Sequence, residues 1–320
     1  MTELTRTDSQ ALETLRAEVE AVRGYVEAAA APATRRAYAS DWRRFSSWCE
    51  ARGLEALPAL PETVATFLAS EAEAGRRAST IGRRVAAIRA AHERAGAAAP
   101  TSAPEVRVTL SGIRRKLGTA PERKAAATSD VLRSMLGTLD GTPAGLRDRA
   151  LLLLGFTGAF RRGELAGLDV SDLAEEGEGL RVRVRRSKTD QEGRGTEKAI
   201  PRDPRPSLCP VAAVRAWLEA AGIQAGPVFR PVSKGGSVGE GRLTGRSVAR
   251  IVKRAAARAG YDADTFGGHS LRAGLVTSAA SAGRDLFAIM DVTGHRSVET
   301  VRGYVRRAQA FENNAAAGLL

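Results

Sequence analysis

The chain has 320 residues, more than one compact core usually holds, so two domains are expected. No segment approaches eighteen consecutive apolar residues, and the N-terminus lacks the apolar stretch of a secretory signal, so neither a membrane span nor a signal peptide is expected. The only cysteines, Cys49 and Cys209, form no C-x-x-C pair, which argues against a disulfide framework or structural zinc and fits a reducing cytoplasm.

The net charge of +13, with a pI near 10.7, is the first functional indication. A charge of this size favours a polyanionic partner, and nucleic acid is the abundant polyanion of a cytoplasm. Most of the basic residues are arginine, which can bind a phosphate through two parallel hydrogen bonds. A GC-rich genome would also raise the ratio of arginine to lysine, but it does not by itself explain the net charge.

Residues 1–33 are polar and alanine-rich, and we interpret them as an N-terminal arm, either loose or helical. Thr34 is a candidate N-cap for a helix in which Tyr38, Trp42, Phe45 and Cys49 share one face. Three more helices are predicted, one opening at Pro61, one running from Ser79 to Gly96 and one following Pro104. The pattern indicates a helical bundle over 34–117.

Arginines are concentrated in the first of these helices and in the third, to which we assign Arg76, Arg77, Arg83, Arg84, Arg89 and Arg94. An arginine-rich helix face is usually only solvated surface, but in a chain of this charge DNA contact is favoured. The candidate DNA-contacting residues are Arg43, Arg44, Arg76, Arg77, Arg83 and Arg84.

A segment rich in Pro, Gly, Ala and charge, residues 118–129, reads as a linker to a second domain over 130–320. That domain is mainly helical, with helices expected near 210–221, 244–259, 269–282, 285–291 and 297–311. Between 170 and 200, LRVRVRR alternates with period two and GTEKAIP follows a polar turn. This pair predicts a small antiparallel sheet, so the fold class is mainly α with a mixed α/β second domain.

Two of the three histidines, His269 and His295, lie near the C-terminus in polar, glycine-flanked contexts, GGHSLRAG and TGHRSVETVRGY. His269 and Arg272 are three residues apart, so on a helix they share a face and can meet the same anion. A purely structural role at the start of the helix is the alternative, and HSLR by itself is a weak motif.

The segment FTGAFRRGELAGL places Arg161 where an apolar helix ends and the next begins. An arginine between two apolar helices needs an anionic partner, and Glu164, one turn later, can supply it. Arg161 then either belongs to a buried structural ion pair or is oriented by Glu164 towards a phosphate. The spacing permits both.

Lys188 lies in the turn-forming stretch after the central strand, where a lysine is usually exposed. Its functional alternative is to protonate a leaving oxygen, and Lys198 on the following strand competes for that role.

Tyr304, nine residues after His295, would often be a core residue on a helix, but its neighbours Arg302, Gly303 and Arg306 weaken that reading.

Arg161 in RRGEL, Lys188, His269-Ser-Leu-Arg272, Gly294-His295 and Tyr304 follow one another as in the tyrosine recombinase (phage integrase) family. The chain resembles the Cre- and Xer-like branch, across the catalytic domain and more weakly over helices 34–117, which correspond to the core-binding domain. Unlike lambda-type integrases, it shows no long arm-binding domain.

The resemblance implies a site-specific DNA recombinase in which Tyr304 forms a 3′-phosphotyrosine bond, and strands are exchanged through a Holliday junction. Arg161, Arg272 and His295 would stabilise the phosphate, His269 would support it, Lys188 would act as the acid and Glu164 would orient Arg161. No metal, nucleotide or other cofactor is expected, and the sequence has no Walker motif.

The implied partners are double-stranded DNA with inverted-repeat sites and three further copies of the chain in a tetramer. We expect the tail after Tyr304 to pack on a neighbouring protomer. We expect the protein to be cytoplasmic, either at the bacterial nucleoid or encoded by a phage or plasmid. Alternatives are a relative that cleaves without exchanging strands, such as a resolvase or a relaxing topoisomerase, or a DNA-binding protein that has lost catalysis.

Overall fold

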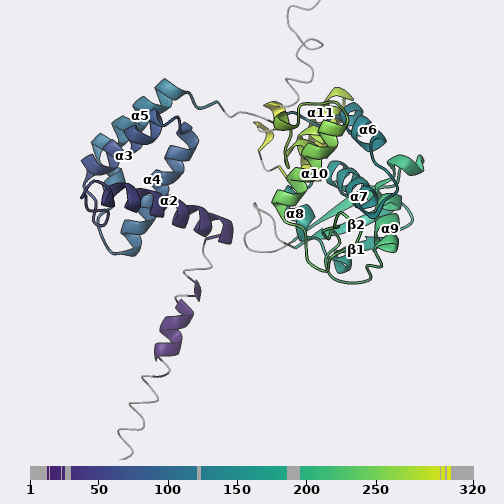
Figure 1. The fold of residues 1–320 in the computed structure, drawn as a ribbon, viewed down its shortest axis with the longest axis horizontal. Helices are drawn as coiled ribbons and strands as arrows, with labels where there is room; N and C mark the ends of the chain where they lie inside the picture. The colour runs from purple at the N-terminus through teal and green to yellow at the C-terminus, as the bar shows by residue number, and fades with distance from the viewer. Residues whose placement is uncertain are drawn as a thin grey trace, which may run out of the picture. The chain divides into compact units, whose positions relative to one another are not determined.

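The structure is a computed structural model that describes residues 13, 15–22, 24, 25, 30–120, 124–185, 195–295, 297–299 and 301–303. Contacts between Cα atoms divide the chain into two compact units, Met1–Glu122 and Arg123–Leu320 (Figure 1). We call them the N-terminal and C-terminal units. The boundary between them falls inside the predicted linker.

The N-terminal unit contains the four predicted helices: α2 (Pro32–Glu50), α3 (Pro61–Glu73), α4 (Ala78–Arg94) and α5 (Pro104–Leu117). Its core is built from apolar side chains that recur at helical spacing, among them Phe45, Val64, Phe67, Leu68, Ile81, Ile88 and Val106. Phe67 packs edge-on against Phe45 and Trp48, with ring centroids 5.1 and 5.4 Å away. The predicted helical bundle is confirmed.

Proline sets the start of three of these helices, because its missing N–H falls among the groups that a first turn leaves unpaired anyway. This is also why the predicted start of α2 is wrong. Thr34 is not the N-cap: the helix begins at Pro32, Ala31 is the N-cap, and the backbone N–H of Thr34 already donates to Ala31 O at 2.8 Å.

The C-terminal unit is mainly helical. In chain order it contains α6 (Ser129–Gly137), α7 (Pro143–Thr157), α8 (Arg162–Gly167), β1 (Leu173–Glu175), β2 (Gly179–Val184), β3 (Thr196–Pro201), α9 (Pro210–Ala220), α10 (Gly245–Arg258), α11 (Ser270–Ser281) and α12 (Leu286–Thr293). Short 3-10 turns occur at Val170–Asp172, Pro206–Leu208 and Ala263–Thr265. Residues 298, 299 and 301–303, in the last predicted helix, are also helical.

The sheet is antiparallel with order β1-β2-β3. Its register pairs Val182 with Lys198 and Leu180 with Ile200 across β2 and β3. The sequence predicted β2 and β3 but not β1, whose three residues are too few to show an alternating pattern.

Helix α7 is the central element of the C-terminal unit, and α9, α10 and α11 pack around it (Figure 1). Every residue from Ala150 to Phe156 is buried, so this half of the helix is apolar on all sides rather than amphipathic. It ends at Thr157, and the next turn brings the chain to Arg161. The buried half of α7 thus provides a rigid base for the first candidate site residue.

The second half of the predicted linker packs on the C-terminal unit. Ala125 N–H donates to Thr265 O at 2.7 Å and Ala127 N–H donates to Ser270 O at 2.9 Å. Ala127 is fully buried, and it lies against α11 at Gly274. These contacts hold the start of α11, the helix that carries Arg272.

Gly274→Ala is therefore expected to destabilise the C-terminal unit. A Cβ at this position would lie 1.9 Å from the carbonyl oxygen of Ala127, a backbone atom that cannot rotate away. Overpacking of this kind costs about 1–3 kcal/mol, measured here as a loss in the free energy of unfolding in urea. The matched control is Gly137→Ala in α6, where nothing lies within 4 Å and alanine favours the helix. Equal stability of Gly274→Ala and the wild type would contradict the expectation.

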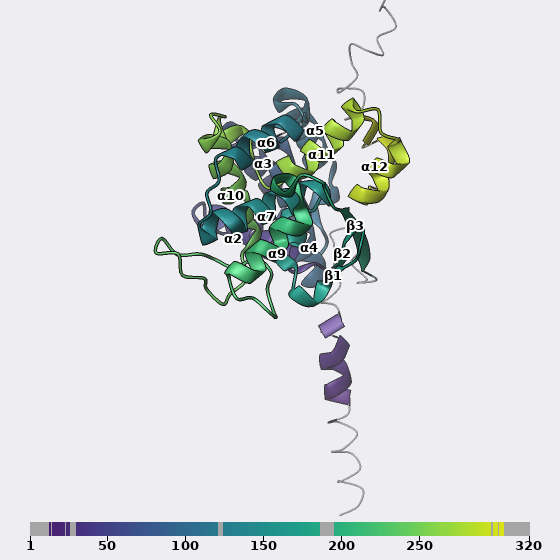
Figure 2. The same ribbon diagram turned by 90° about the vertical axis from the view of Figure 1, so that its right-hand side faces the viewer.

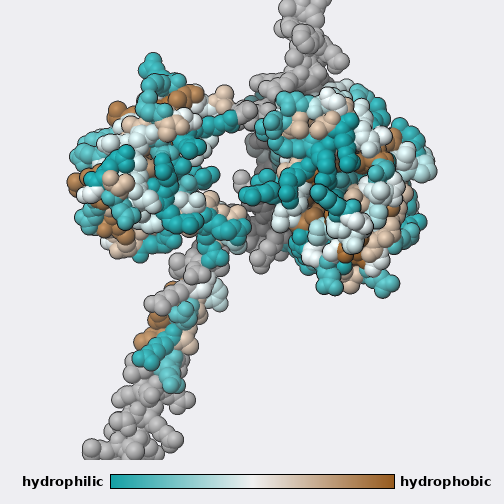
Figure 3. All heavy atoms as spheres, viewed as in Figure 1, coloured by the Kyte–Doolittle hydropathy of each residue, from teal (hydrophilic) through white to brown (hydrophobic). Residues whose placement is uncertain are grey.

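Hydrophilic side chains cover much of the visible surface of each unit, interrupted by scattered apolar patches (Figure 3). Within the described part of the chain, no helix has both the length and the apolarity to span a bilayer.

Candidate functional site

Arg161 and Glu164 form the first part of the site, at the start of α8. Arg161 is the N-cap residue; Glu164 accepts from its backbone N–H at 2.9 Å and from its Nη1 at 2.6 Å. The Glu164 side chain is 4% exposed, whereas that of Arg161 is 23% exposed. The predicted ion pair is present, and it leaves part of the guanidinium open to a ligand.

Arg272 lies in the first turn of α11 and is only 2% exposed. Its Nη1 donates to Ala159 O at 3.0 Å, in the turn between α7 and α8. Ala159 has a φ of +47°, a backbone conformation that residues other than glycine rarely adopt. The preceding Gly158 leaves room for the Phe160 ring, which would lie 2.2 Å from a Cβ at position 158. This tight turn places the carbonyl of Ala159, which accepts from Arg272, two residues before Arg161 in the chain.

His295 completes the cluster from the end of α12. Its Nε2 lies 3.1 Å from Arg272 Nη2, and its Nδ1 lies 2.8 Å from the hydroxyl of Thr293. Since arginine only donates, Nε2 accepts, so the neutral ring carries its proton on Nδ1 and donates it to Thr293. The Thr293 hydroxyl in turn donates to Ile289 O at 2.7 Å. This chain of hydrogen bonds fixes both the ring and its tautomer.

His269 is the N-cap residue of α11, immediately before the turn that carries Arg272. The glycine before it is needed for packing, because a Cβ at Gly268 would lie within 2.7 Å of the Arg162 side chain. Burial lowers the pKa of His269, and the nearby Arg272 and Arg161 lower it further. His269 therefore lies within electrostatic range of both arginines; HSLR predicted its proximity to Arg272, and the fold adds Arg161.

The cluster carries an excess of positive charge. Burial lowers the pKa of His295 to about 4, with Arg272, Arg161, His269 and Lys198 adding to the effect. Burial also lowers the pKa of Lys198 to about 8; Arg272 and Arg161 lower it further, whereas Glu164 opposes the shift. The cluster thus combines one carboxylate, that of Glu164, with three cationic groups: the guanidiniums of Arg161 and Arg272 and the ammonium of Lys198. This excess of positive charge favours an anionic ligand.

The depressed pKa of His295 predicts a stability change on acidification. Between its ordinary pKa of 6.5 and about 4, the unfolded state binds a proton that the folded state does not. The free energy of unfolding therefore falls as the pH falls through this window, and His295 makes no further contribution below it. Denaturant unfolding from pH 7.5 to 4.5 should show a steeper loss for the wild type than for His295→Gln. Parallel profiles would contradict the assignment.

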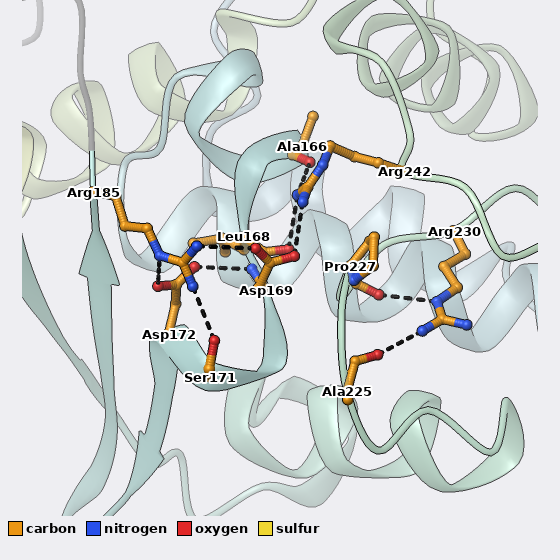
Figure 4. A network of polar contacts seen from close by, with 10 residues as sticks. All are labelled: Ala166, Leu168, Asp169, Ser171, Asp172, Arg185, Ala225, Pro227, Arg230 and Arg242. Atoms are coloured by element: carbon orange, nitrogen blue, oxygen red, sulfur yellow. Dashed lines mark hydrogen bonds and ion pairs between the residues drawn. The ribbon is translucent and has the colours of Figure 1, made fainter.

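A second network ties α8 to the end of β2 (Figure 4). Arg185 donates to Asp172 at 2.6 Å, to Asp169 at 3.2 Å and to Ser171 at 2.9 Å. Arg242 donates to the other oxygen of Asp169 at 2.7 Å and to the carbonyls at 166 and 168. These contacts hold Arg185, the residue directly after β2, against the segment that follows α8. No local sequence pattern indicates them, because the partners are distant along the chain.

Four of the six candidate DNA-contacting arginines pair with two buried carboxylates of the N-terminal unit, Asp41 and Glu71. Arg83 donates to both oxygens of Asp41, at 2.6 and 3.1 Å, and Arg44 donates to Glu71 at 3.0 Å. Arg84 is paired with both carboxylates, and its side chain is 11% exposed. Those of Arg44, Arg76 and Arg83 are about half exposed. Arg43 and Arg77 are exposed as well. DNA contact by these six residues stays a prediction.

Of the predicted site residues, Arg161, Glu164, His269, Arg272 and His295 come together in one cluster. Lys188 and Tyr304 lie outside the described residues. Lys198, considered only as a competitor for Lys188, is found at the cluster. In the described part of the chain, no group of three or more His, Cys, Asp or Glu residues is arranged to hold a metal ion.

Comparison with known proteins agrees with this geometry. Residues 126–310 match the phage integrase family, and residues 24–98 match the phage integrase N-terminal SAM-like domain. The chain is 40% identical over 294 residues to the integrase/recombinase xerD homolog of Selenomonas ruminantium, covering 91% of this chain and 86% of that protein. It is 30% identical over 289 residues to tyrosine recombinase XerC of Mycobacterium tuberculosis (strain ATCC 25177 / H37Ra), covering 87% and 89%.

Two solved structures have the same fold, each at 19% identity. The XerH site-specific recombinase in its post-cleavage complex with a palindromic difH substrate aligns with a TM-score of 0.57, over 81% of this chain and 72% of that chain. The lambda integrase dimer bound to a COC′ core site aligns with a TM-score of 0.56, over 92% and 94%.

The family match spans more than half of the chain, and it includes the cluster around Arg161, Arg272 and His295. The protein therefore belongs to the phage integrase family and is a tyrosine-type site-specific recombinase.

Proposed function

We propose that the protein cleaves and rejoins DNA through a covalent bond between Tyr304 and a backbone phosphate. The Tyr304 oxygen attacks the phosphorus and loses its proton, the bond from phosphorus to the 5′ oxygen breaks, and that oxygen takes up a proton. The products are a 3′-phosphotyrosine and a free 5′-hydroxyl. Attack of a second strand's 5′-hydroxyl on the phosphotyrosine reverses the step and releases Tyr304.

The observation that carries this proposal is the convergence of Arg161, Arg272 and His295 on one small, cationic site. A phosphodiester gathers negative charge on its non-bridging oxygens as the nucleophile arrives, and fixed donors there lower the barrier. Arg161 is held by Glu164 and Arg272 by Ala159 O, so neither needs to reorganise during the reaction. When a phosphate displaces Arg272 from Nε2 of His295, its negative charge favours protonation of that nitrogen. His295 then donates to the phosphate, and His269 supports the phosphate or proton movement at Tyr304.

The departing 5′ oxygen needs an acid, and Lys188 is the residue we assign to that role. No metal or nucleotide enters the scheme, because the phosphotyrosine conserves the energy of the backbone bond. We expect cleavage to proceed in EDTA without added nucleotide.

We further propose that the substrate is double-stranded DNA with inverted-repeat sites, and that four copies of the chain exchange strands through a Holliday junction. The N-terminal unit would contact DNA through its arginines, which the buried Asp41 and Glu71 hold in place. The setting of this reaction would be the cytoplasm.

A suicide substrate tests the reaction. The half-site is first selected from a randomised DNA pool by binding to the full chain, and is then nicked so that the cleaved fragment diffuses away. We expect a DNA–protein adduct that survives SDS. Trypsin cleaves after Arg302 and Arg306, so mass spectrometry should place the nucleotide on the peptide 303–306, which contains Tyr304. DNA binding without an adduct would indicate a relative that has lost catalysis.

Two intact sites in one reaction distinguish recombination from simple cleavage. A recombinase yields fragments that join DNA from both sites, with a transient four-way junction. Resealed or relaxed DNA without such fragments would indicate cleavage without strand exchange.

We expect removal of residues 312–320 to weaken assembly on DNA and to slow recombination. This tail, ENNAAAGLL, ends in apolar residues and lies outside the described part of the chain. The comparison uses sedimentation of the protein–DNA complex and product yield from paired sites, with half-site binding as the control. Unchanged tetramer formation and unchanged recombination would refute packing of the tail on a neighbour.

A further inference from the structure

Lys198 is a half-buried cation at the site that the reaction scheme leaves without a role. It lies on β3 opposite Val182, and its ammonium is 5.3 Å from the centroid of the Phe160 ring. Phe160 directly precedes Arg161. Lys198 Nζ also donates to the carbonyl oxygen of Val292, 94 residues later in the chain. One side chain thus joins the sheet, the α7–α8 turn and α12.

The carbonyl of Val292 belongs to the last turn of α12, where a helix leaves its final carbonyls without partners from its own backbone. A cation at this end also opposes the negative end of the helix dipole. Thr293 follows, and its hydroxyl accepts from His295 Nδ1. Gly294 then turns the chain through the left-handed region, with a φ of +65°. Lys198 therefore anchors the turn from which His295 projects.

In the part of the chain that the structure describes, few other contacts fix this turn from outside α12. The helix lies beside α11 (Figure 2). The two pack through a small apolar cluster, Val276, Ala280, Ile289 and Val301. That cluster lies on the face of α12 that carries Ile289, whereas Lys198 reaches the C-terminal end. Apolar packing alone leaves rotation about the last turn weakly determined, because it is not directional. A charge-assisted hydrogen bond is directional and supplies that constraint.

We propose that Lys198 is a positioning residue for His295: by holding the Val292 carbonyl, it sets the last turn of α12 and keeps the His295 ring beside Arg272. The inference rests on the proposed role of His295 as a donor to the phosphate. The role of acid to the 5′ oxygen stays with Lys188.

The electrostatic setting supports a functional reason for a lysine here. Burial and the neighbouring Arg272 and Arg161 lower the pKa of Lys198 to about 8, so keeping its ammonium charged at this position costs free energy. Glu164 offsets part of that cost. A residue kept for stability alone would avoid this position, since an apolar side chain would pack on Phe160 without the penalty.

The test measures the rate of adduct formation on the suicide half-site with DNA at saturation. Lys198→Met keeps the apolar stem but cannot donate, and we expect the rate to fall on the order of tenfold to a hundredfold, the cost of a misplaced group. Lys198→Arg, which still donates, should recover most of the rate. DNA affinity should change little in either variant. Lys253→Met is the matched control, because Lys253 is paired with Asp264 on the exposed side of α10.

A double-mutant cycle separates positioning from a general structural effect. In the background of His295→Gln, Lys198→Met should slow the reaction further by less than about twofold, because the group that it positions is gone. Multiplicative losses would overturn the proposal, and so would an unchanged rate in Lys198→Met. If His295→Gln itself leaves the rate unchanged, the proposed role of His295 fails instead.

A substrate with sulfur in place of the bridging 5′ oxygen distinguishes the two lysines. Sulfur leaves without being protonated, so it should rescue a variant that lacks the acid. We expect rescue of Lys188→Ala and none of Lys198→Met. Rescue of Lys198→Met would make Lys198 the acid and overturn the positioning role.

Discussion

Tyr304→Phe is expected to abolish covalent adduct formation while leaving DNA binding at the wild-type level. The substitution removes only the hydroxyl oxygen, which is the atom proposed to bond to phosphorus. The cluster around Arg161 and Arg272 is held by its own hydrogen bonds, so the phosphate should still bind. The measurement is SDS-stable adduct on the suicide half-site, alongside the affinity for the same DNA.

Tyr261→Phe is the matched control. Tyr261 packs against Phe266, with ring centroids 5.9 Å apart, at the end of α10, and has no part in the scheme. It should form adduct at the wild-type rate. An adduct formed by Tyr304→Phe at any comparable rate would assign the nucleophile to another residue.

Arg272→Lys is expected to lower the rate of adduct formation by roughly 10²–10³, the usual cost of losing one fixed donor to a developing charge. Lysine keeps the positive charge but not the planar fork. Arg272 uses one nitrogen for Ala159 O and another for His295, so a single ammonium cannot reproduce both contacts. The ring of His295 would lose its partner as well, which compounds the defect.

The loss should appear in the rate at saturating DNA rather than in affinity, because the proposed contacts of the other arginines with phosphates would still hold the duplex. Arg230→Lys serves as the control, since the Arg230 guanidinium donates to carbonyls of its own loop, those of Pro227 and Ala225 (Figure 4). A drop in affinity with an unchanged saturated rate would show that Arg272 binds DNA without stabilising the transition state.

The parts of the site that lie close together in sequence were predictable. Arg161 and Glu164 are three residues apart, as are His269 and Arg272, and helical spacing alone brings each pair to one face. The four N-terminal helices were also visible, because proline marked three of their starts and apolar side chains recurred along each. The N-cap was misplaced by three residues, at Thr34 instead of Ala31, because a capping side chain was chosen over a proline at the first turn.

The parts that depend on distant contacts were not predictable. Lys198 and Lys188 are both lysines near the same hairpin, and nothing in their local sequence ranks one over the other. The contact of Lys198 with Val292 spans 94 residues. The carbonyl that holds Arg272 belongs to Ala159, 113 residues earlier, and its geometry requires a positive φ at an alanine.

The sequence alone determined that this is a basic protein of two mainly helical domains, with Tyr304 last in an ordered series of anion-binding residues. Charge, helical period and the order of motifs are properties of the chain and need no folding to be read. The tertiary structure decided which cationic side chains come together, which backbone carbonyls accept hydrogen bonds from them and which side chains have a lowered pKa. Those properties arise from burial and from contacts between distant segments, and they exist only once α7, β3, α11 and α12 have packed together.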